Sequence, residues 1–418
     1  MRTVGLIVEY NPYHYGHLYH LQQSRKITDA DAVVAVMSGN FLQRGEPALM
    51  DKWARAETAL RAGCDLVIEL PVAYSTQAAE WFARGAISLL EATGVVDAFC
   101  FGSESGNLTP LTQAASFLAD EPDAFRQLVK ANLATGIQYP AAYSSAVKQY
   151  LSILGHEEAS AFAFDAPNHT LGLHYLIAKQ RIGSTMAAYT IQREKAGYHQ
   201  TDITDAQIAS ATAIRKLLTE DLSLTSARAY VPSSTYSIME REWQEKRAPM
   251  SWESFRTPLF HNLAMQSTES LALLHEMSEG LEHRLKQALP KLQQLSVQAL
   301  LDKVSTKRYT RTKLQRVLLS VLLHHRKEHL SADNLANGIG YIRVLGFTDK
   351  GRELLKRMRR TASLPVLLSA AGGANLPSPS PYLELDVQAS QIYALGQGSA
   401  SPRAMFRDYY EQPIRITE

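Results

Sequence analysis

The chain has 418 residues and a mass of 46.4 kDa, which exceeds the size at which one hydrophobic core usually keeps growing, so two domains are expected. With 45% hydrophobic and 20% charged residues and a formal net charge of +2, it is neither a disordered chain nor a uniformly basic one. Two cysteines, Cys64 and Cys100, exclude a disulfide framework and a four-cysteine zinc site, and the lack of long uncharged runs predicts a cytoplasmic protein without a membrane span.

The first half of the chain alternates apolar strands with amphipathic helices. Short β-rich runs predict buried strands at residues 3–10, 31–38, 65–71, 97–103 and 186–194. Helical periodicity predicts helices at residues 17–26, 52–62, 77–93 and 205–220. This alternation is typical of a parallel sheet covered on both faces, so the predicted fold class is α/β and Rossmann-like.

The second half of the chain predicts a different architecture. The β signal mostly disappears after residue 236, and residues 250–360 read as a helical bundle with a Gly-rich hinge at residues 337–347. We therefore predict an α/β domain at residues 1–235 and a mainly helical domain at residues 236–418.

The stretch EYNPYHYGHLYHL (9–21) directly follows the first predicted strand and places His14 and His17 on either side of Gly16. A helix that begins near Gly16 directs its free backbone N–H groups and its dipole toward a ligand above the sheet. Glycine lets the backbone approach that ligand, and the imidazoles offer N–H donors to the oxygens of a reacting phosphate. The pattern predicts a site for nucleotidyl transfer.

Two other interpretations of these histidines stay open. They could form a metal-binding pair, although no acidic or cysteine ligands accompany them at a suitable helical spacing. They could also be ordinary histidines that are satisfied by local hydrogen bonds. His20 is expected to pack on the helix face that carries His17.

The stretch SATAIR (210–215) is the second chemical signature, because its hydroxyls, free N–H groups and guanidinium suit a triphosphate. The alternative is an N-capped surface helix with one exposed arginine. Its position after the His-x-Gly-His element favours the phosphate site, to which we assign Ser210, Thr212 and Arg215.

Several longer motifs accompany these two elements within residues 1–220. They are GLIVEYNPYHYGHLYHL, MSGNFLQRGEPALMDKWARAETAL, DLVIELP, FGSES, PNHTLGLHYL, QREKAGYH and SATAIR. Together they resemble the bacterial tRNA(Met) cytidine acetate ligases, a family within the HIGH-motif nucleotidyltransferase superfamily. The resemblance implies a Rossmann-like nucleotidyltransferase domain with a parallel sheet, and it is fainter over the C-terminal half.

The resemblance also implies a reaction. Such a ligase activates acetate with ATP to give acetyl-adenylate and pyrophosphate, and then transfers the acetyl group to N4 of the wobble cytidine of elongator tRNA(Met). Mg²⁺ is expected to accompany ATP, but no dedicated metal ligands stand out in the sequence. The sequence leaves the oligomeric state open.

The resemblance assigns residues to this reaction by position. His14 and His17 would be catalytic, and the ATP site would comprise Ile7, Val8, Glu9, Tyr10, Asn11, Pro12, Tyr13, His14, Tyr15, Gly16, His17, Leu18, Tyr19, His20, Gly102, Asn168 and Arg193. Each of the last three also has a physical interpretation. Gly102 could let a nucleotide approach the backbone, or it could simply end a strand. Asn168 could cap a helix, and Arg193 could bind a phosphate.

A basic segment at residues 303–327 contains no Asp or Glu. Its apolar residues recur at helical spacing, so one face is expected to pack while the basic side chains project outward. We predict RNA contacts for these five residues: Lys307, Arg308, Arg311, Lys313 and Arg316. Residues 350–360 add a second basic face along which a tRNA backbone could run.

Two further functions remain possible on the sequence alone. An adenylyltransferase with a small-molecule acceptor would share the first-half motifs but would not need a basic helical half. A non-catalytic RNA-binding protein could use the same scaffold without turnover.

Overall fold

The computed structural model describes residues 1–193, 209–220, 223–377 and 380–417. Within these ranges the centre is an eight-stranded sheet in the order β5-β4-β1-β2-β3-β6-β7, with β8 paired to β6. The strands are β1 (Thr3–Val8), β2 (Ala32–Ser38), β3 (Leu66–Leu70), β4 (Ala98–Ser103), β5 (Ala187–Gln192), β6 (Ile342–Thr348), β7 (Val366–Leu367) and β8 (Ile414–Ile416).

The five N-terminal strands pair in parallel; β1 to β4 are buried on both faces of the sheet, whereas β5 at its edge is partly exposed. Strand β2 shows the alternation. Val33 and Ala35 pack with α1 (Tyr15–Thr28) and α2 (Lys52–Arg61), whereas Val34 and Val36 belong to the core formed with α4 (Ala79–Ala92) and α9 (Pro167–Arg181). Successive side chains of a strand point to opposite faces, so an unbroken apolar run is what a doubly covered sheet requires.

The predicted α/β class is therefore confirmed, and all five predicted strands exist within two residues of their expected ends. The helix predicted over residues 205–220 is α10 (Ala211–Glu220) in the part that the structure describes. Residues 205–208 and most of the QREKAGYH motif lie outside the described ranges.

The expectation that the β signal ends near residue 236 is wrong. Residues 342–348, which overlap the predicted hinge, form β6, and this strand pairs antiparallel with β3 inside the main sheet. The apolar run was obscured by flanking glycines and by Arg343, which is buried beside Asp408 rather than solvated. The boundary near residue 235 stays a prediction, but the C-terminal segment completes the N-terminal sheet.

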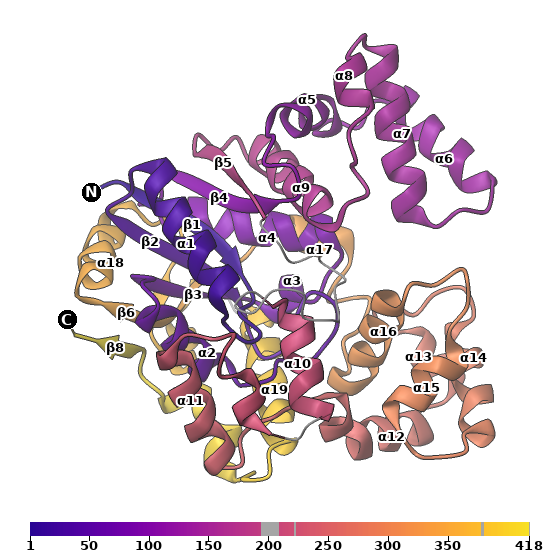
Figure 1. Cartoon of the computed structure of the whole chain (residues 1–418). Helices are drawn as coiled ribbons and strands as arrows, with labels where there is room; N and C mark the ends of the chain where they lie inside the picture. Colours follow the sequence, from indigo (N-terminus) through magenta and orange to yellow (C-terminus); the bar gives the residue numbers. More distant parts are fainter. Residues whose placement is uncertain (194–208, 221–222, 378–379, 418) are drawn as a thin grey trace.

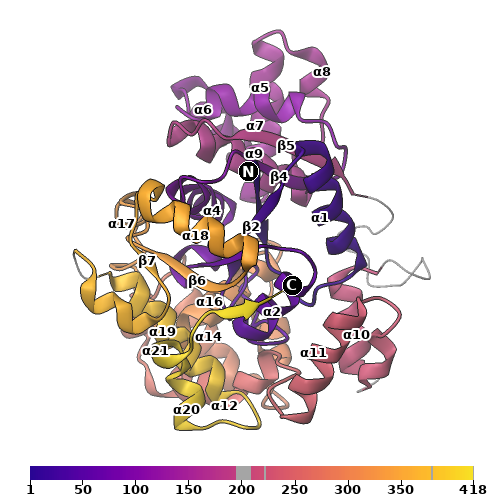
Figure 2. The same cartoon turned by 90° about the vertical axis from the view of Figure 1, so that its left-hand side faces the viewer.

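Two groups of helices project from the same side of the sheet and lie one above the other in Figure 1. Figure 2 shows the same two groups above and below the sheet. The first group contains α5 (Thr109–Leu118), α6 (Asp123–Ala134), α7 (Tyr139–Ile153) and α8 (Glu157–Ser160). The second contains α12 (Arg256–Met265), α13 (Thr268–Ala272), α14 (Leu281–Ala288), α15 (Val297–Val304) and α16 (Arg311–Leu323). They meet where the Gln138 amide donates a hydrogen bond of 2.6 Å to the Lys307 carbonyl.

The remaining α-helices are α3 (Val72–Ser75), α11 (Ser233–Gln244), α17 (Ala332–Ala336), α18 (Asp349–Thr361), α19 (Pro381–Leu395), α20 (Pro402–Met405) and α21 (Arg407–Tyr410). Among them, α18 packs on strands β2, β3 and β6, α11 packs on α2, α19 packs on α3 and α20, and the others have four or five residues. Among the described helices, none has the length and apolar character needed to cross a bilayer.

Candidate active site

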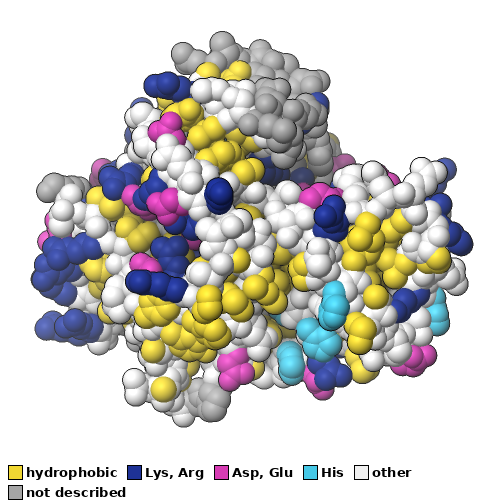
Figure 3. All heavy atoms as spheres, turned by 90° about the horizontal axis from the view of Figure 1, so that it is seen from below, with side chains coloured by type: hydrophobic (Ala, Val, Ile, Leu, Met, Phe, Trp, Pro, Cys, Tyr) yellow, Lys and Arg dark blue, Asp and Glu magenta, His cyan; other side chains and the backbone are white. Residues whose placement is uncertain are grey.

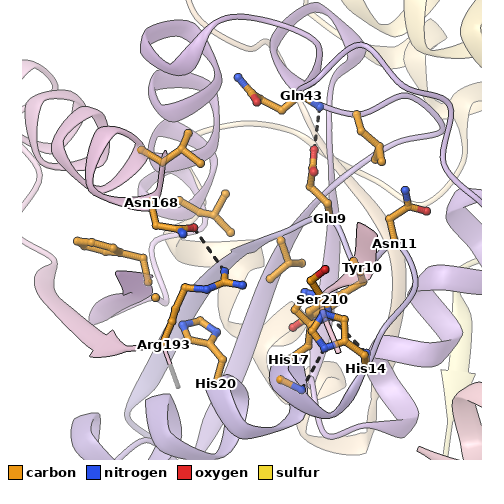
Figure 4. A pocket seen from close by; sticks show the side chains of 18 of the residues that line it. Glu9, Tyr10, Asn11, His14, His17, His20, Gln43, Asn168, Arg193 and Ser210 are labelled. Atoms are coloured by element: carbon orange, nitrogen blue, oxygen red, sulfur yellow. Dashed lines mark hydrogen bonds between the residues drawn. The ribbon is translucent and has the colours of Figure 1, made fainter. Parts of the chain in front are cut away.

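A pocket lies at the carboxyl ends of β1, β4 and β5, beside the first turn of α1 (Figure 4). In open parallel sheets this edge is where ligands bind. Most residues of the predicted site line it: Ile7, Val8, Glu9, Tyr10, Asn11, His14, Gly16, His17, Tyr19, His20, Gly102, Asn168, Arg193, Ser210, Thr212 and Arg215.

Four residues of the predicted ATP loop do not line the pocket: Pro12, Tyr13, Tyr15 and Leu18. Tyr13 is buried and packs edge-on against Tyr10, with 4.7 Å between the ring centroids. Tyr15, the first residue of α1, is 38% exposed. Residues three apart share one face of a helix, so Tyr15 and Leu18 lie on a face of α1 that does not line the pocket, and a continuous sequence motif cannot contribute every side chain to one cavity.

The two histidines of the motif stack beside the start of α1, with 3.8 Å between their ring centroids. His14 is the N-cap of α1, and its Nδ1 accepts a hydrogen bond of 3.0 Å from the Gly16 backbone N–H. The Nδ1 of His17 accepts from the His14 backbone N–H at 3.4 Å. Because both Nδ1 atoms are acceptors, each neutral ring carries its hydrogen on Nε2.

The surroundings keep both rings neutral. Burial, followed by the charges of Arg193 and Arg215, lowers the pKa of His14 to about 3. Burial and the neighbouring His14 hold the pKa of His17 well below its usual value. A neutral imidazole that presents Nε2–H is a hydrogen-bond donor, so the pair can bind phosphate oxygens without taking up a proton.

The neutral state of His14 predicts an acid-sensitive fold. Below pH 6.5 the unfolded chain protonates this ring and the folded chain does not, so lowering the pH to 5.5 should cost about 1.4 kcal/mol of unfolding free energy for His14 alone. Urea titrations at pH 7.5 and pH 5.5 should show a smaller acid loss for His14→Gln than for the wild type. His283→Gln, at a residue that is 64% exposed, should keep the full loss. Equal losses in all three proteins would contradict this prediction.

Gly16 has a second structural role besides the predicted approach to a ligand, which stays a prediction. A Cβ at this position would lie 2.8 Å from Cε1 of His14, closer than carbon atoms approach each other. The missing side chain therefore makes room for the capping imidazole, and Gly16 also lines the pocket.

The wall near β4 and β5 combines Arg193, Asn168 and Gly102. Arg193 donates a hydrogen bond of 3.4 Å to Oδ1 of Asn168, and a Cβ on Gly102 would lie 3.3 Å from the Arg193 side chain. His20 also lines this pocket, and its buried Nε2 has no hydrogen-bond partner among the described residues. The wall thus presents a guanidinium and an imidazole to one ligand.

The interpretation of Asn168 as a helix cap is wrong. Asn168 lies inside the first turn of α9, and Glu104 caps that helix from the loop after β4. The Glu104 carboxylate accepts hydrogen bonds of 3.0 Å from the backbone N–H groups of both Asn168 and His169. The sequence did not reveal this role of Glu104, because its partners lie more than 60 residues later in the chain. The usual capping pattern involves a residue directly before the helix.

The SATAIR element also contributes to the lining of the pocket, through Ser210, Ala211, Thr212 and Arg215. Arg215 donates a hydrogen bond of 2.8 Å to the Asn11 carbonyl and one of 3.3 Å to Glu46. Ser210 lines the pocket and also accepts from the Ala213 backbone N–H at 3.1 Å, so this residue both caps α10 and faces the cavity.

Arg55 is a positioning residue that the sequence did not reveal. This fully buried side chain donates to the carbonyls of Glu9 at 2.6 Å, Ser38 at 3.1 Å and Met50 at 3.1 Å. It therefore joins the ends of β1 and β2 under the pocket. An arginine in an amphipathic helix usually indicates a solvated face, so no sequence signal distinguished it.

The predicted RNA residues divide into two groups. Lys307, Arg308 and Arg311 are exposed, although Arg308 pairs with Glu279 at 2.8 Å and Arg311 pairs with Asp302 at 3.3 Å. Lys313 and Arg316 do not project outward as predicted. Both are largely covered and form ion pairs with Glu276, because the start of α16 packs against the segment that carries this glutamate.

The fold and the pocket define a nucleotidyltransferase. A family model described as HIGH Nucleotidyl Transferase matches residues 1–407. The chain is 38% identical over 400 residues to the tRNA(Met) cytidine acetate ligase of Acetivibrio thermocellus, with 94% of this chain and 95% of that protein covered. It is 38% identical over 417 residues to the protein of the same name from Lysinibacillus sphaericus, with 99% and 100% covered.

Two solved structures from Thermotoga maritima are similar over the full length of both chains. TmcAL in its apo form has a TM-score of 0.92 at 36% identity, and TmcAL bound with alpha-thio ATP has a TM-score of 0.90 at 35% identity. This chain belongs to the tRNA(Met) cytidine acetate ligase family.

Proposed function

We propose that this protein is an ATP-dependent ligase that activates acetate and transfers the acetyl group to a cytidine of tRNA(Met). The observation that carries the proposal is the pair of neutral, Nε2-protonated imidazoles at the start of α1, which face a pocket that also receives Arg193 and Arg215. Family membership supplies acetate and the tRNA as the substrates.

In the first step, an oxygen of acetate attacks the α-phosphorus of ATP, and pyrophosphate leaves. His14 and His17 donate hydrogen bonds to the phosphate oxygens on which negative charge develops. Arg193 and Arg215 both line this pocket, where they would bind the nucleotide and the departing pyrophosphate. The products of this step are acetyl-adenylate and pyrophosphate.

In the second step, N4 of the wobble cytidine of elongator tRNA(Met) attacks the acetyl carbonyl and AMP leaves. The shared pocket would hold the activated acyl group while the tRNA delivers its base, which converts the attack into an intramolecular one. A wobble base must leave its stack to reach such a pocket.

Mg²⁺ would enter with ATP through the phosphate oxygens. Among the described residues no group of three His, Cys, Asp or Glu side chains could hold a metal ion, so we assign no side chain to it. We also propose a cytoplasmic location, where the tRNA substrate is found.

Mass spectrometry of elongator tRNA(Met), incubated with the protein, ATP and labelled acetate, tests the function directly. The expected result is labelled N4-acetylcytidine together with AMP and pyrophosphate. Pyrophosphate exchange without acetylation of any tRNA would indicate a small-molecule adenylyltransferase instead. RNA binding without exchange would indicate a non-catalytic binder.

The exposed basic residues before α16 are expected to contribute to tRNA affinity. Replacing Lys307, Arg308 and Arg311 together with alanine should weaken binding and reduce the slope of log affinity against log salt by about 1 for each phosphate group that the variant no longer binds. Filter binding at several salt concentrations measures this slope.

The second basic face provides the comparison, because a tRNA backbone could also run along it. On α18, Arg352, Lys356 and Arg359 are exposed, and this helix lies at the edge of the molecule away from α16 (Figure 1). In Figure 3, Lys and Arg side chains gather at that same edge. If the triple alanine variant of α18 loses more affinity than the α16 variant, the tRNA runs along α18 and our assignment to α16 is wrong.

A further inference from the structure

The described residues that line the pocket include two carboxylates, Glu9 and Glu46. Glu46 uses both oxygens, because Oε2 accepts from Arg215 at 3.3 Å and Oε1 accepts from Gln315 at 3.0 Å. Glu9 uses only one. Its Oε1 accepts from the Gln43 backbone N–H at 2.7 Å and from the Ser38 hydroxyl at 3.5 Å.

The second oxygen of Glu9 is available to a ligand. Oε2 accepts no hydrogen bond from any residue that the structure describes, and it belongs to a side chain that lines the cavity. Figure 4 shows Glu9 joined to the Gln43 amide and separated from Asn168 and Arg193. The hydrogen bonds to Oε1 therefore hold the carboxylate in place, while Oε2 stays available to a ligand in the pocket.

A carboxylate repels a triphosphate, so this oxygen is unsuited to bind the phosphates of ATP directly. It is well suited to the acceptor. The exocyclic amine of cytosine is a hydrogen-bond donor, and Asp and Glu are the side chains that accept from it. This amine is also a weak nucleophile that must lose a proton when it forms an amide.

We propose that Glu9 is the catalytic base of the transfer step and that it also recognises the cytidine amine. The inference rests on the proposed function. The N4 lone pair forms a bond to the acetyl carbon, the bond between that carbon and the AMP oxygen breaks, and AMP leaves with the electron pair. The proton of N4 passes to Oε2 of Glu9, which later releases it to water.

The surroundings of Glu9 agree with this role. Burial raises the pKa of its carboxyl above the ordinary value, against the opposing influence of the Gln43 N–H and Arg55, which brings it closer to the pH at which a base works best. The charged groups that face Glu9 are Arg55 from α2 and Arg44 and Glu46 from the loop after β2.

The loop that holds Glu9 in place, residues 43–46, also contacts α16, and we propose that RNA binds beside the start of this helix. A Cβ on Gly45 would lie 2.6 Å from the backbone nitrogen of Arg316, and Gln315 donates to Glu46. Residues 43–46 therefore run between Glu9 and α16. An RNA held beside α16 would approach the pocket on the side where Glu9 lies.

The two half-reactions separate this role from nucleotide binding. Acetate-dependent pyrophosphate exchange without tRNA reports the first step, and single-turnover transfer from preformed acetyl-adenylate to tRNA reports the second. Glu9→Gln keeps an oxygen for the Gln43 N–H and removes the base. We expect transfer to slow by about 10²–10⁴, with exchange changed by less than about tenfold. Glu9→Asp should retain part of the transfer rate, and Glu353→Gln, at an exposed residue of α18, should match the wild type.

If Glu9→Gln transfers the acetyl group at the wild-type rate, the proposal is overturned. An equal loss of rate in both half-reactions would also overturn it, since that result indicates a role in binding ATP or its Mg²⁺. If Glu9→Gln does not fold, the pH dependence of the wild-type protein tests the proposal instead. Its transfer rate must rise with pH along a limb that is absent from exchange, and a flat profile would overturn the proposal. A wild type that performs neither half-reaction would refute the proposed function itself.

Discussion

The His17→Ala variant is expected to perform acetate-dependent pyrophosphate exchange about 10²–10³ times more slowly than the wild type, the usual effect of removing one preorganised donor to a developing negative charge. The fixed Nδ1 contact to the His14 backbone orients the ring, so its Nε2–H is already aligned before ATP binds. The loss should appear in kcat more than in KM, because the charge that this hydrogen bond stabilises exists mainly in the transition state.

The control for His17→Ala is His283→Ala, which removes a histidine that is 64% exposed on α14 and should leave the exchange rate as in the wild type. His17 also packs against Tyr10, with 5.0 Å between the ring centroids, so thermal unfolding should accompany the kinetics. If a folded His17→Ala protein exchanges pyrophosphate at more than a tenth of the wild-type rate, the imidazoles do not stabilise the reacting phosphate.

The Lys52→Met variant is expected to lose about 3–5 kcal/mol of unfolding free energy, the usual cost of removing one partner from a buried ion pair. The Lys52 ammonium contacts Glu69 at 2.8 Å and Asp408 at 2.8 Å, and all three side chains are at most 4% exposed. Burial alone would lower the pKa of Lys52, but Asp408 and Glu69 outweigh it and raise this pKa. Without the lysine, two buried carboxylates lose the ammonium that contacts both of them, and Arg343 contacts Asp408 at 3.4 Å.

Urea unfolding at pH 7.5 measures this loss. Arg126→Met breaks the ion pair with Asp123, whose side chains are 61% and 86% exposed, and should change stability by less than about 1 kcal/mol. If both variants lose a similar amount of unfolding free energy, the buried cluster contributes no more to stability than a surface ion pair does. The cluster joins α2 and β3 to α21, so its loss should also loosen the C-terminal segment from the sheet.

Local chemistry explains which parts of the structure were predictable. The strands β1 to β5 follow from apolar runs, and the start of α1 follows from a capping residue and a glycine, all of which lie within a few neighbours in sequence. The His-x-Gly-His element, Arg193 and the SATAIR loop could be placed in one pocket because parallel strands bring their carboxyl ends to one edge.

The unpredicted features depend on partners that are distant in sequence. Glu104 caps a helix 64 residues later, Arg55 joins the ends of two strands, and Lys52 meets Asp408 across 356 residues. The insertion of β6 next to β3 is of the same kind.

By itself, the sequence determined the α/β class, the His-x-Gly-His motif and the family of this protein, because each of them depends on short, contiguous sequence patterns. Only the tertiary structure decided which charged side chains are buried, which of two carboxylates in the pocket keeps an available oxygen, and which basic residues face solvent. The physical reason is that the burial and pairing of a charge depend on the segments that the fold packs around it. The residues next to that charge in the sequence do not reveal which distant segments those are.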